Sequence, residues 1–355
     1  MEGALAMITL GIIGLEQSGK KTIFSALTSG QHGKGPAQQR GANQVAVVSV
    51  PDPRIDILNK MYNPKKTAYA QVEYLLPAFN VKKEGSENES ETWKSARTCD
   101  AIIHVVRNFS HPVLGDPESE KDFKALETEL AITDLMIVEK RIERIEAERK
   151  RGRKGNEEEY SLLQSCKEAL EAEKSLRDFS SLANHALLKG FAFLSAKPRL
   201  IVFNNADEDN QTPAWATSEH VCLNALVVRG RIEMELAGMT PEDASEFTSE
   251  YGISVSALDR VIQSSYDALG LISFFTVGED EVKAWPIQRG TVALDAAAEV
   301  HSDIKKGFIR AEVVGYEDII KAGSLQEARK QGTFRLEGKL YKVNDGDIVH
   351  FRFSV

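Results

Sequence analysis

Gly14-Leu15-Glu16-Gln17-Ser18-Gly19-Lys20-Lys21-Thr22 is the stretch of this chain that decides the fold. It follows an apolar run, Ile8–Ile13, and precedes an amphipathic run that contains Phe24 and Leu27. Strand, glycine loop and helix in this order form the context in which G-x-x-x-x-G-K-[ST] marks a phosphate-binding P-loop. Backbone N–H groups of such a loop and the N-terminus of its helix attract anions, and Lys20 is placed to reach the outer phosphates. The sequence therefore predicts a nucleotide or phosphate site.

The last position of this motif departs from the pattern. Lys21 stands where Ser or Thr would hold Mg²⁺, and an ammonium group cannot coordinate a metal. Whether the loop binds a nucleotide and whether it hydrolyses one thus become separate questions. A plain turn between strand and helix is the alternative interpretation, which the rest of the match, in its strand–helix context, disfavours.

The composition indicates a soluble, globular protein. The chain has 355 residues, of which 42% are hydrophobic and 27% charged, and this length predicts two or three domains. No apolar run approaches the ~20 residues that cross a bilayer, so no membrane partner is expected. The net charge of -9 argues against nucleic-acid binding over the whole surface, and DNA is not expected as a partner.

The cysteines and the first residues bear on the compartment. Cys99, Cys166 and Cys222 lack C-x-x-C spacing, which favours a reducing cytoplasm and argues against a zinc site. The stretch Met1–Met7 has no basic region ahead of its apolar residues, so we expect no signal peptide. The sequence predicts a cytoplasmic protein with no metal-ligand cluster.

Short apolar runs predict a doubly wound α/β sheet. The runs Ile8–Ile13, Ala101–Val106, Leu200–Phe203 and Ala225–Val228 are typical of buried parallel strands, and their separations leave room for crossover helices. We expect the nucleotide domain to be formed in two parts, residues 1–118 and 191–275.

A helical hairpin is predicted between these two parts, over residues 119–190. From about residue 121 to 150 the sequence is strongly helical, with Leu135, Val138 and Ile142 on one face. A break at Arg151–Asn156 is followed by a second helical pattern that begins near Leu163. Two such helices joined by a glycine-containing turn are typical of an antiparallel coiled coil.

The predicted hairpin tip is basic, with the residues Arg149, Lys150, Arg151, Arg153 and Lys154. In an acidic protein a concentrated basic tip is a candidate contact for a phosphate backbone, and so for RNA. A charged, solvated hairpin end is the alternative, and the sequence leaves both open.

The last eighty residues predict a compact α+β domain, residues 276–355. Phe308–Val313, Thr333–Leu336 and Ile348–Phe353 have the pattern of strands, and Asn344–Asp347 supplies a turn.

Together these segments resemble the YchF/Obg-like ATPase family, within the translation-factor-related (TRAFAC) class of P-loop GTPase-like proteins. The resemblance covers essentially the whole chain, in order. It is carried by the blocks Gly14–Thr28, Val50–Arg54, Asp100–Arg107, Val138–Arg144, Gly307–Val313, Arg335–Lys339, Asp345–Asp347 and His350–Phe353. It implies a P-loop domain with an inserted coiled-coil hairpin, a C-terminal TGS domain of β-grasp fold, and ribosome or structured RNA as a partner.

The resemblance also implies a nucleotide preference. The family prefers ATP to GTP and reads the base with Asn-x-x-Glu in place of Asn-Lys-x-Asp, which Asn205 and Glu208 match. A carboxylate acceptor at a purine edge selects for a donor, such as the exocyclic amine of adenine. A polar loop at a strand end is the alternative. The family's base-supporting Ser-Ala-Lys aligns with Arg229-Gly230-Arg231, which keeps the backbone donors.

Several motifs of the family are altered where the chemistry is expected. Its D-x-x-G motif aligns with Leu76-Pro77-Ala78-Phe79, and the Thr of its first switch aligns with Arg40. The metal carboxylate, the metal hydroxyl and the glycine that meets the γ-phosphate are thus replaced together. Lys21 beside Lys20 could neutralise phosphates without the metal, so Mg²⁺ is in doubt.

The sequence therefore predicts a protein that binds ATP, or GTP, with weak or absent hydrolysis, and it assigns no catalytic residue. An active ATPase or GTPase is one alternative, and a scaffold that binds RNA or the ribosome without nucleotide is another.

Overall fold

The computed structural model describes residues 7–29, 42–78, 90–152, 156–216, 225–250 and 256–354. Its contacts divide the chain into two compact units. One comprises residues 1–8, 47–73 and 262–355, and the other comprises residues 9–46 and 74–261.

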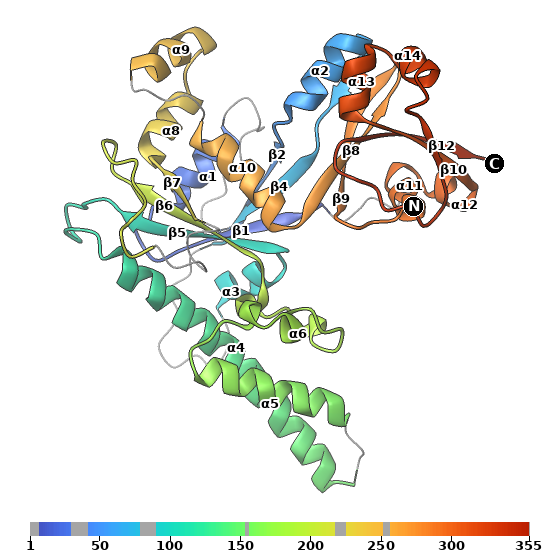
Figure 1. Cartoon of the computed structure of the whole chain (residues 1–355). Helices are drawn as coiled ribbons and strands as arrows, with labels where there is room; N and C mark the ends of the chain where they lie inside the picture. The colour runs from blue at the N-terminus through green and yellow to red at the C-terminus, as the bar shows by residue number, and fades with distance from the viewer. Residues whose placement is uncertain are drawn as a thin grey trace. The chain divides into compact units, whose positions relative to one another are not determined.

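A six-stranded sheet with the order β2-β4-β1-β5-β6-β7 carries the glycine loop (Figure 1). Its strands are β1 Thr9–Ile13, β2 Gln44–Ser49, β4 Gln71–Leu76, β5 Ala101–Asn108, β6 Arg199–Asn205 and β7 Ala225–Val228. β1, β5, β6 and β7 pair in parallel, and the central strand β5 is buried along nearly its whole length. The four predicted strands and the α/β class are confirmed.

Helices cover both faces of this sheet. The helices α1 Lys20–Thr28 and α8 Gly230–Ala237 pack together on one side, whereas α3 Glu91–Arg97 and the first turns of α4 Ser119–Lys150 lie on the other (Figure 1). Ile13 and Ile102 of the sheet pack there against Trp93, Leu126 and Leu130. Two further helices, α9 Pro241–Glu250 and α10 Ala257–Ala268, follow α8.

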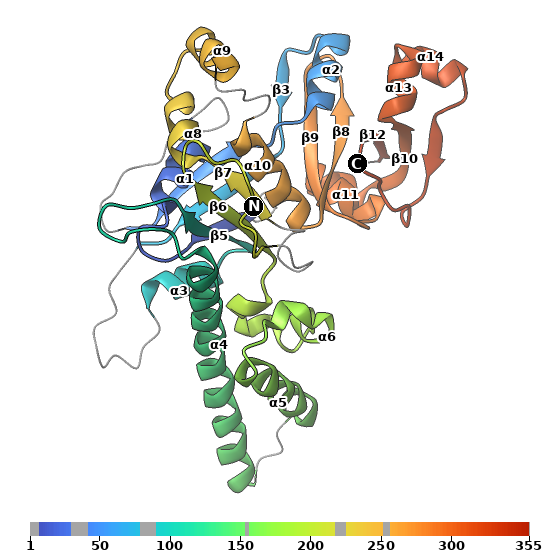
Figure 2. The ribbon, with the colours of Figure 1, turned by 60° about the vertical axis from the view of Figure 1, so that its left-hand side comes forward.

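The helices α4 and α5 (Glu157–Glu171) form an antiparallel pair (Figure 2). Ion pairs Arg149–Glu157 and Lys167–Glu139 join opposite ends of the pair, as antiparallel packing requires. Leu163 is fully buried, and Leu135 packs against the same apolar cluster. The helical pair expected from the sequence is present. The boundaries at 119 and 190 stay a prediction, as does its description as a coiled coil.

Short helices follow the pair and return the chain to β6. They are η1 Leu176–Asp178, α6 Ser180–Ala183, η2 Lys189–Phe191 and η3 Leu194–Ala196. Arg177 and Arg199 both contact Glu127 of α4, at 2.8 Å and 2.5 Å, and this ion cluster joins the base of α4 to β6.

The unit of residues 1–8, 47–73 and 262–355 contains a mixed sheet with the order β11-β10-β12-β8-β9-β3. Its strands are β3 Lys66–Ala68, β8 Leu271–Val277, β9 Glu281–Gln288, β10 Phe308–Gly315, β11 Arg335–Glu337 and β12 Asp347–Phe353. Its helices are α2 Pro53–Tyr62, α11 Ala293–Val300, α12 Ser302–Lys306, α13 Tyr316–Ala322 and α14 Leu325–Lys330. The predicted domain boundary at 275/276 falls inside β8. The TGS assignment stays a prediction.

An early segment of the chain belongs to this unit. Helix α2 packs on β8 and β9, and β3 pairs with β9. Nη1 and Nη2 of Arg54 donate to the carboxylate of Asp345, at 2.8 Å and 3.2 Å. Arg54 also forms an ion pair with Asp52, which caps the start of α2. Arg54 therefore connects the start of α2 to the turn before β12.

No helix in the described ranges is both long and apolar enough to cross a bilayer.

Candidate functional site

The glycine loop connects the end of β1 to the start of α1, as the motif predicts. Gly19 caps the helix with a left-handed backbone, φ 89°, which glycine adopts without steric cost. A Cβ atom at Gly19 would lie 2.1 Å from Nδ2 of Asn204, and one at Gly14 would lie 2.4 Å from the carbonyl oxygen of Val105. Both positions thus require glycine.

Lys20 is held at this loop by backbone carbonyls. Its ammonium donates hydrogen bonds to the oxygens of Gly14, at 2.7 Å, and Leu15, at 2.5 Å. Burial lowers the pKa of Lys20 to about 8, while the carboxylate of Glu16 opposes this shift and the charge of Lys21 adds to it. The cation is therefore positioned by the loop and stabilised poorly by its surroundings, as suits a group that receives an anion.

The remaining predicted loop residues lie on the same turn. Gln17 has a left-handed backbone, φ 58°, and alternation of left- and right-handed residues is typical of loops whose N–H groups converge on an anion. The side chains of Glu16, Gln17 and Lys21 are exposed, Leu15 and Thr22 are half-buried, and Ser18 is buried.

Asn204, which the sequence analysis did not single out, joins the glycine loop to the β7–α8 connection. Its Nδ2 donates to the carbonyl of Ser18 at 3.1 Å, and its Oδ1 accepts from the N–H of Gly230 at 3.1 Å. A Cβ atom at Gly230 would lie 2.7 Å from that Oδ1. The predicted site residues Arg229 and Gly230 therefore adjoin the loop, but the N–H of Gly230 is bonded to Asn204.

The side-chain amide of Asn205 contacts other residues than the glycine loop. It accepts from Nδ2 of Asn108 at 3.0 Å and donates to the carbonyl of Gln211 at 2.8 Å. Successive side chains of a strand point to opposite faces, so only one of the two consecutive asparagines can face the loop. Glu208, three residues after Asn205, is exposed.

Asp207 has the same three-residue spacing from Asn204. Its carboxylate lies 3.5 Å from Nε of Arg231, and its carbonyl accepts from Arg229 at 3.3 Å. The structure thus links Asn204 to the loop and to Gly230, and links Asp207 to the neighbouring Arg229 and Arg231. In the sequence, the Asn-x-x-acid spacing fits both Asn204 with Asp207 and Asn205 with Glu208. The structure distinguishes the two pairs, because only the Asn204 side chain is directed to the glycine loop.

The expected metal ligands are replaced by groups that do not fit Mg²⁺. Lys21 presents an ammonium, and Leu76, at the end of β4, is a buried apolar side chain. No group of three His, Cys, Asp or Glu residues suited to a metal occurs in the described part of the chain. Mg²⁺ needs near-octahedral oxygen ligands, and neither Lys21 nor Leu76 supplies one.

Ala78, one of the two described residues that follow Leu76, is held by side-chain hydrogen bonds. Asn43 accepts from the N–H of Ala78 at 2.9 Å and donates to Oγ of Ser95 at 2.9 Å, and Thr92 donates to the carbonyl of Ala78 at 2.8 Å. Two further predicted departures, Arg40 and Phe79, lie outside the described residues.

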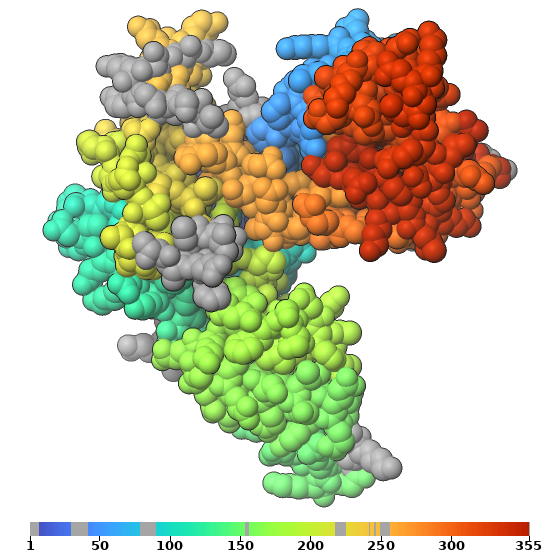
Figure 3. Space-filling view, in the orientation of Figure 1, coloured from blue at the N-terminus to red at the C-terminus, as the bar shows by residue number. Residues whose placement is uncertain are grey.

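The basic hairpin tip is partly neutralised. Arg149 pairs with Glu157 at 2.6 Å, and its guanidinium lies 4.0 Å from the ring centre of Tyr160. Helix α5 begins with three consecutive glutamates. Lys150 and Arg151 are exposed at this end of the pair, which is also open to solvent in Figure 3. Arg153 and Lys154 lie outside the described residues.

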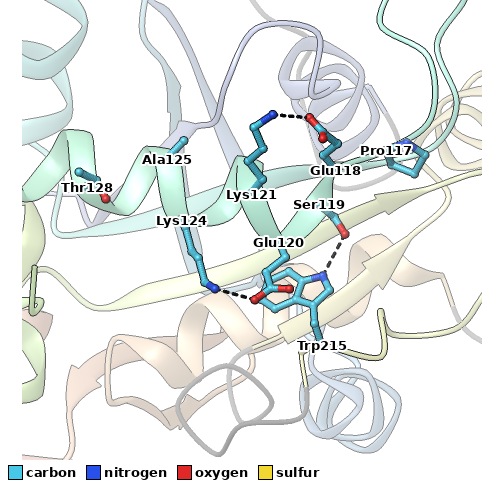
Figure 4. A pocket seen from close by; sticks show the side chains of 9 residues that line it. All are labelled: Pro117, Glu118, Ser119, Glu120, Lys121, Lys124, Ala125, Thr128 and Trp215. Atoms are coloured by element: carbon cyan, nitrogen blue, oxygen red, sulfur yellow. Dashed lines mark hydrogen bonds and ion pairs between the residues drawn. The ribbon is translucent and has the colours of Figure 1, made fainter.

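A shallow cavity of about 700 Å³ lies at the start of α4, and no residue of the glycine loop lines it (Figure 4). Its charged side chains are paired with each other, Lys121 with Glu118 and Lys124 with Glu120, and Trp215 donates to Ser119 at 2.9 Å. These pairings satisfy its four charged side chains.

Comparison with known proteins identifies relatives over the whole length. The family YchF-GTPase_C, described as "Protein of unknown function (DUF933)", matches residues 271–354. "Ribosome-binding ATPase YchF" of Bacillus subtilis (strain 168) is 37% identical, over 98% of this chain and 100% of its own length. The protein of the same name from Escherichia coli O157:H7 is 34% identical, over 97% and 99%.

A solved structure has the same fold. The YchF GTPase of Schizosaccharomyces pombe superposes with a TM-score of 0.83 at 27% identity, over 99% of this chain and 100% of that chain.

Proposed function

The chain belongs to the YchF family, and from that premise we propose that it is a purine-nucleotide-binding, ribosome-associated protein with weak or absent hydrolysis. The observation that carries the proposal is Lys20, whose ammonium is held at the glycine loop with its pKa lowered to about 8. A half-buried cation at the N-terminus of a helix suits a phosphate chain.

Weak hydrolysis is expected because two residues that would hold the metal are replaced. Phosphoryl transfer depends mostly on positioning and on electrostatic stabilisation around the metal. Removing one such stabilising group typically costs about 3 kcal/mol, or roughly a hundredfold in rate. Lys21 and Leu76 replace two of them. The naming of the relatives as ATPases supports the alternative, an active enzyme.

ATP is the proposed ligand over GTP, because the Bacillus subtilis and Escherichia coli relatives are named as ATPases. We propose that Asp207 takes the base-reading role that the sequence suggested for Glu208, because Asn204 and not Asn205 contacts the loop. A carboxylate accepts from an exocyclic purine amine. Asp207→Asn should then change the ratio of ATP to GTP affinity, and Glu208→Gln is the matched control that should leave it unchanged.

Calorimetric titration with ATP, ADP and GTP tests the binding itself. Lys20→Ala should weaken ATP binding by about 2–4 kcal/mol, the scale for truncating one partner of a buried charge pair. Equal affinity in the variant and the parent would show that the loop no longer binds phosphate. Binding to ribosomes that does not respond to nucleotide would then favour the scaffold.

Ribosome or RNA association is tested by co-sedimentation across a salt series. Neutralising Arg149, Lys150, Arg151, Arg153 and Lys154 should weaken it and flatten its salt dependence, because fewer counterions are released. Since Arg149 is paired with Glu157, changing Lys150 and Arg151 alone should give more of the effect than changing Arg149 alone. An unchanged slope in the five-site variant would identify the tip as a solvated helix end.

A further inference from the structure

We infer that the glycine-loop site takes its nucleotide in the metal-free form, with the ammonium groups of Lys20 and Lys21 in place of Mg²⁺. This inference rests on the proposed nucleotide binding. It concerns the form of the ligand, and it would distinguish this chain from P-loop proteins that hold Mg²⁺ through a Ser or Thr hydroxyl.

The two cations occupy the first turn of α1. Lys20 and Lys21 are its first two residues, and this turn contains no acidic side chain. Lys20 is fixed by the carbonyls of Gly14 and Leu15, whereas Lys21 is exposed. Consecutive side chains at the start of a helix can both reach an anion seated on its N-terminus. The charge of Lys21 lowers the pKa of Lys20, after the larger effects of burial, which also lowers it, and of the Glu16 carboxylate, which raises it.

Among the described residues, the position of the family's metal carboxylate carries no oxygen ligand. The Leu76 side chain is 4% exposed and apolar.

Electrostatic interactions at the loop then favour the lysine ammonium groups over a divalent metal ion as partners of the phosphates. A lysine ammonium is a compact charge with three donors, which suits phosphate oxygens. A divalent ion at the usual position would be close to the Lys21 ammonium and repelled by it. Binding of metal-free ATP brings the negative charge to both lysines without that repulsion.

The test is a titration of the full chain with ATP in excess EDTA and, in parallel, in excess Mg²⁺. We expect affinity in EDTA at least equal to that in Mg²⁺. Affinity that is tenfold or more higher in Mg²⁺, where about 1.4 kcal/mol corresponds to tenfold, would overturn the inference.

Two variants at one position separate charge from metal ligation. Lys21→Thr should weaken binding in EDTA by about tenfold and make Mg²⁺ strengthen it, because a hydroxyl ligand returns. Lys21→Met should weaken binding equally in EDTA without gaining a response to Mg²⁺. The exposed Lys60 of α2 gives the control, since Lys60→Thr changes the net charge equally and should have no effect.

The outcomes distinguish this inference from the proposed function. Binding that requires Mg²⁺ contradicts the inference and leaves the nucleotide site intact. Absence of binding in both buffers, with Lys20→Ala indistinguishable from the parent, contradicts both.

Discussion

At the scale of single residues, Lys20 links nucleotide binding to pH. Its pKa is lowered from 10.5 to about 8, chiefly by burial, and bound phosphates would raise the pKa again. Between pH 8 and 10.5, the Lys20 side chain is protonated in a larger fraction of unfolded than of folded molecules. Raising the pH from about 8 to 10.5 therefore increases the free energy of unfolding through Lys20.

For ligand affinity the sign is reversed. Below pH 8 the ammonium is charged in both the free and the bound protein, so affinity should be flat. Above pH 8 binding must take up a proton, and affinity should fall by up to about tenfold per pH unit. Titrations between pH 7.5 and 9.5 check this, with Lys20→Arg as the control that stays charged. A flat profile in the parent would contradict the role of Lys20.

At the scale of elements, one buried carboxylate joins α4 to its neighbours. Asp134 is fully buried and accepts from Nη1 of Arg97 at 2.7 Å. It also accepts from the N–H groups of Leu194 and Ser195, at 3.1 Å and 2.7 Å. The helices α3 and α4 and the turn η3 therefore meet at one side chain.

Asp134→Ala should lower the free energy of unfolding by about 3–5 kcal/mol, because it removes the partner of a largely buried cation and of two backbone donors. Urea unfolding followed by circular dichroism measures this. Glu143→Ala removes an exposed acid from the same helix and should change stability by less than about 0.5 kcal/mol. Equal effects of the two substitutions would show that the buried cluster adds nothing.

At the scale of the whole molecule, the unit that contains the C-terminal sheet is discontinuous in sequence. Ile55 and Leu58 of α2 are fully buried, and α2 packs on β8 and β9. A chain that ends at residue 270 lacks both strands, so these two side chains would be exposed, at about 1.5–3 kcal/mol each.

Such a truncated chain should unfold at a lower temperature and bind the dye ANS, which reports exposed apolar surface. Arg54→Lys gives a milder control, since it keeps the charge and loses the paired bonds to Asp345. A truncated chain that stays compact and does not bind ANS would contradict this assignment of α2.

Because deletion of the C-terminal strands would also expose α2, a binding role of this unit is better tested by substitution of exposed residues. Lys339 and Leu340, which follow β11, are two such residues.

The sequence by itself determined the features that depend on local spacing. The glycine loop, the parallel strands β1, β5, β6 and β7, and the paired helices α4 and α5 are recorded in motif spacing, apolar runs and helical periodicity. The replacement of the metal hydroxyl by Lys21 is equally a matter of one motif position.

Only the tertiary structure decided which distant residues complete these features. Asn204 and Asn205 are equivalent in sequence, and the direction in which β6 faces made Asn204 the partner of Ser18 and Gly230. Arg54 and Asp345 are 291 positions apart, and their contact places α2 in the C-terminal unit. Local periodicity records which face of an element is buried, but the residue that covers that face is set by how separate elements pack.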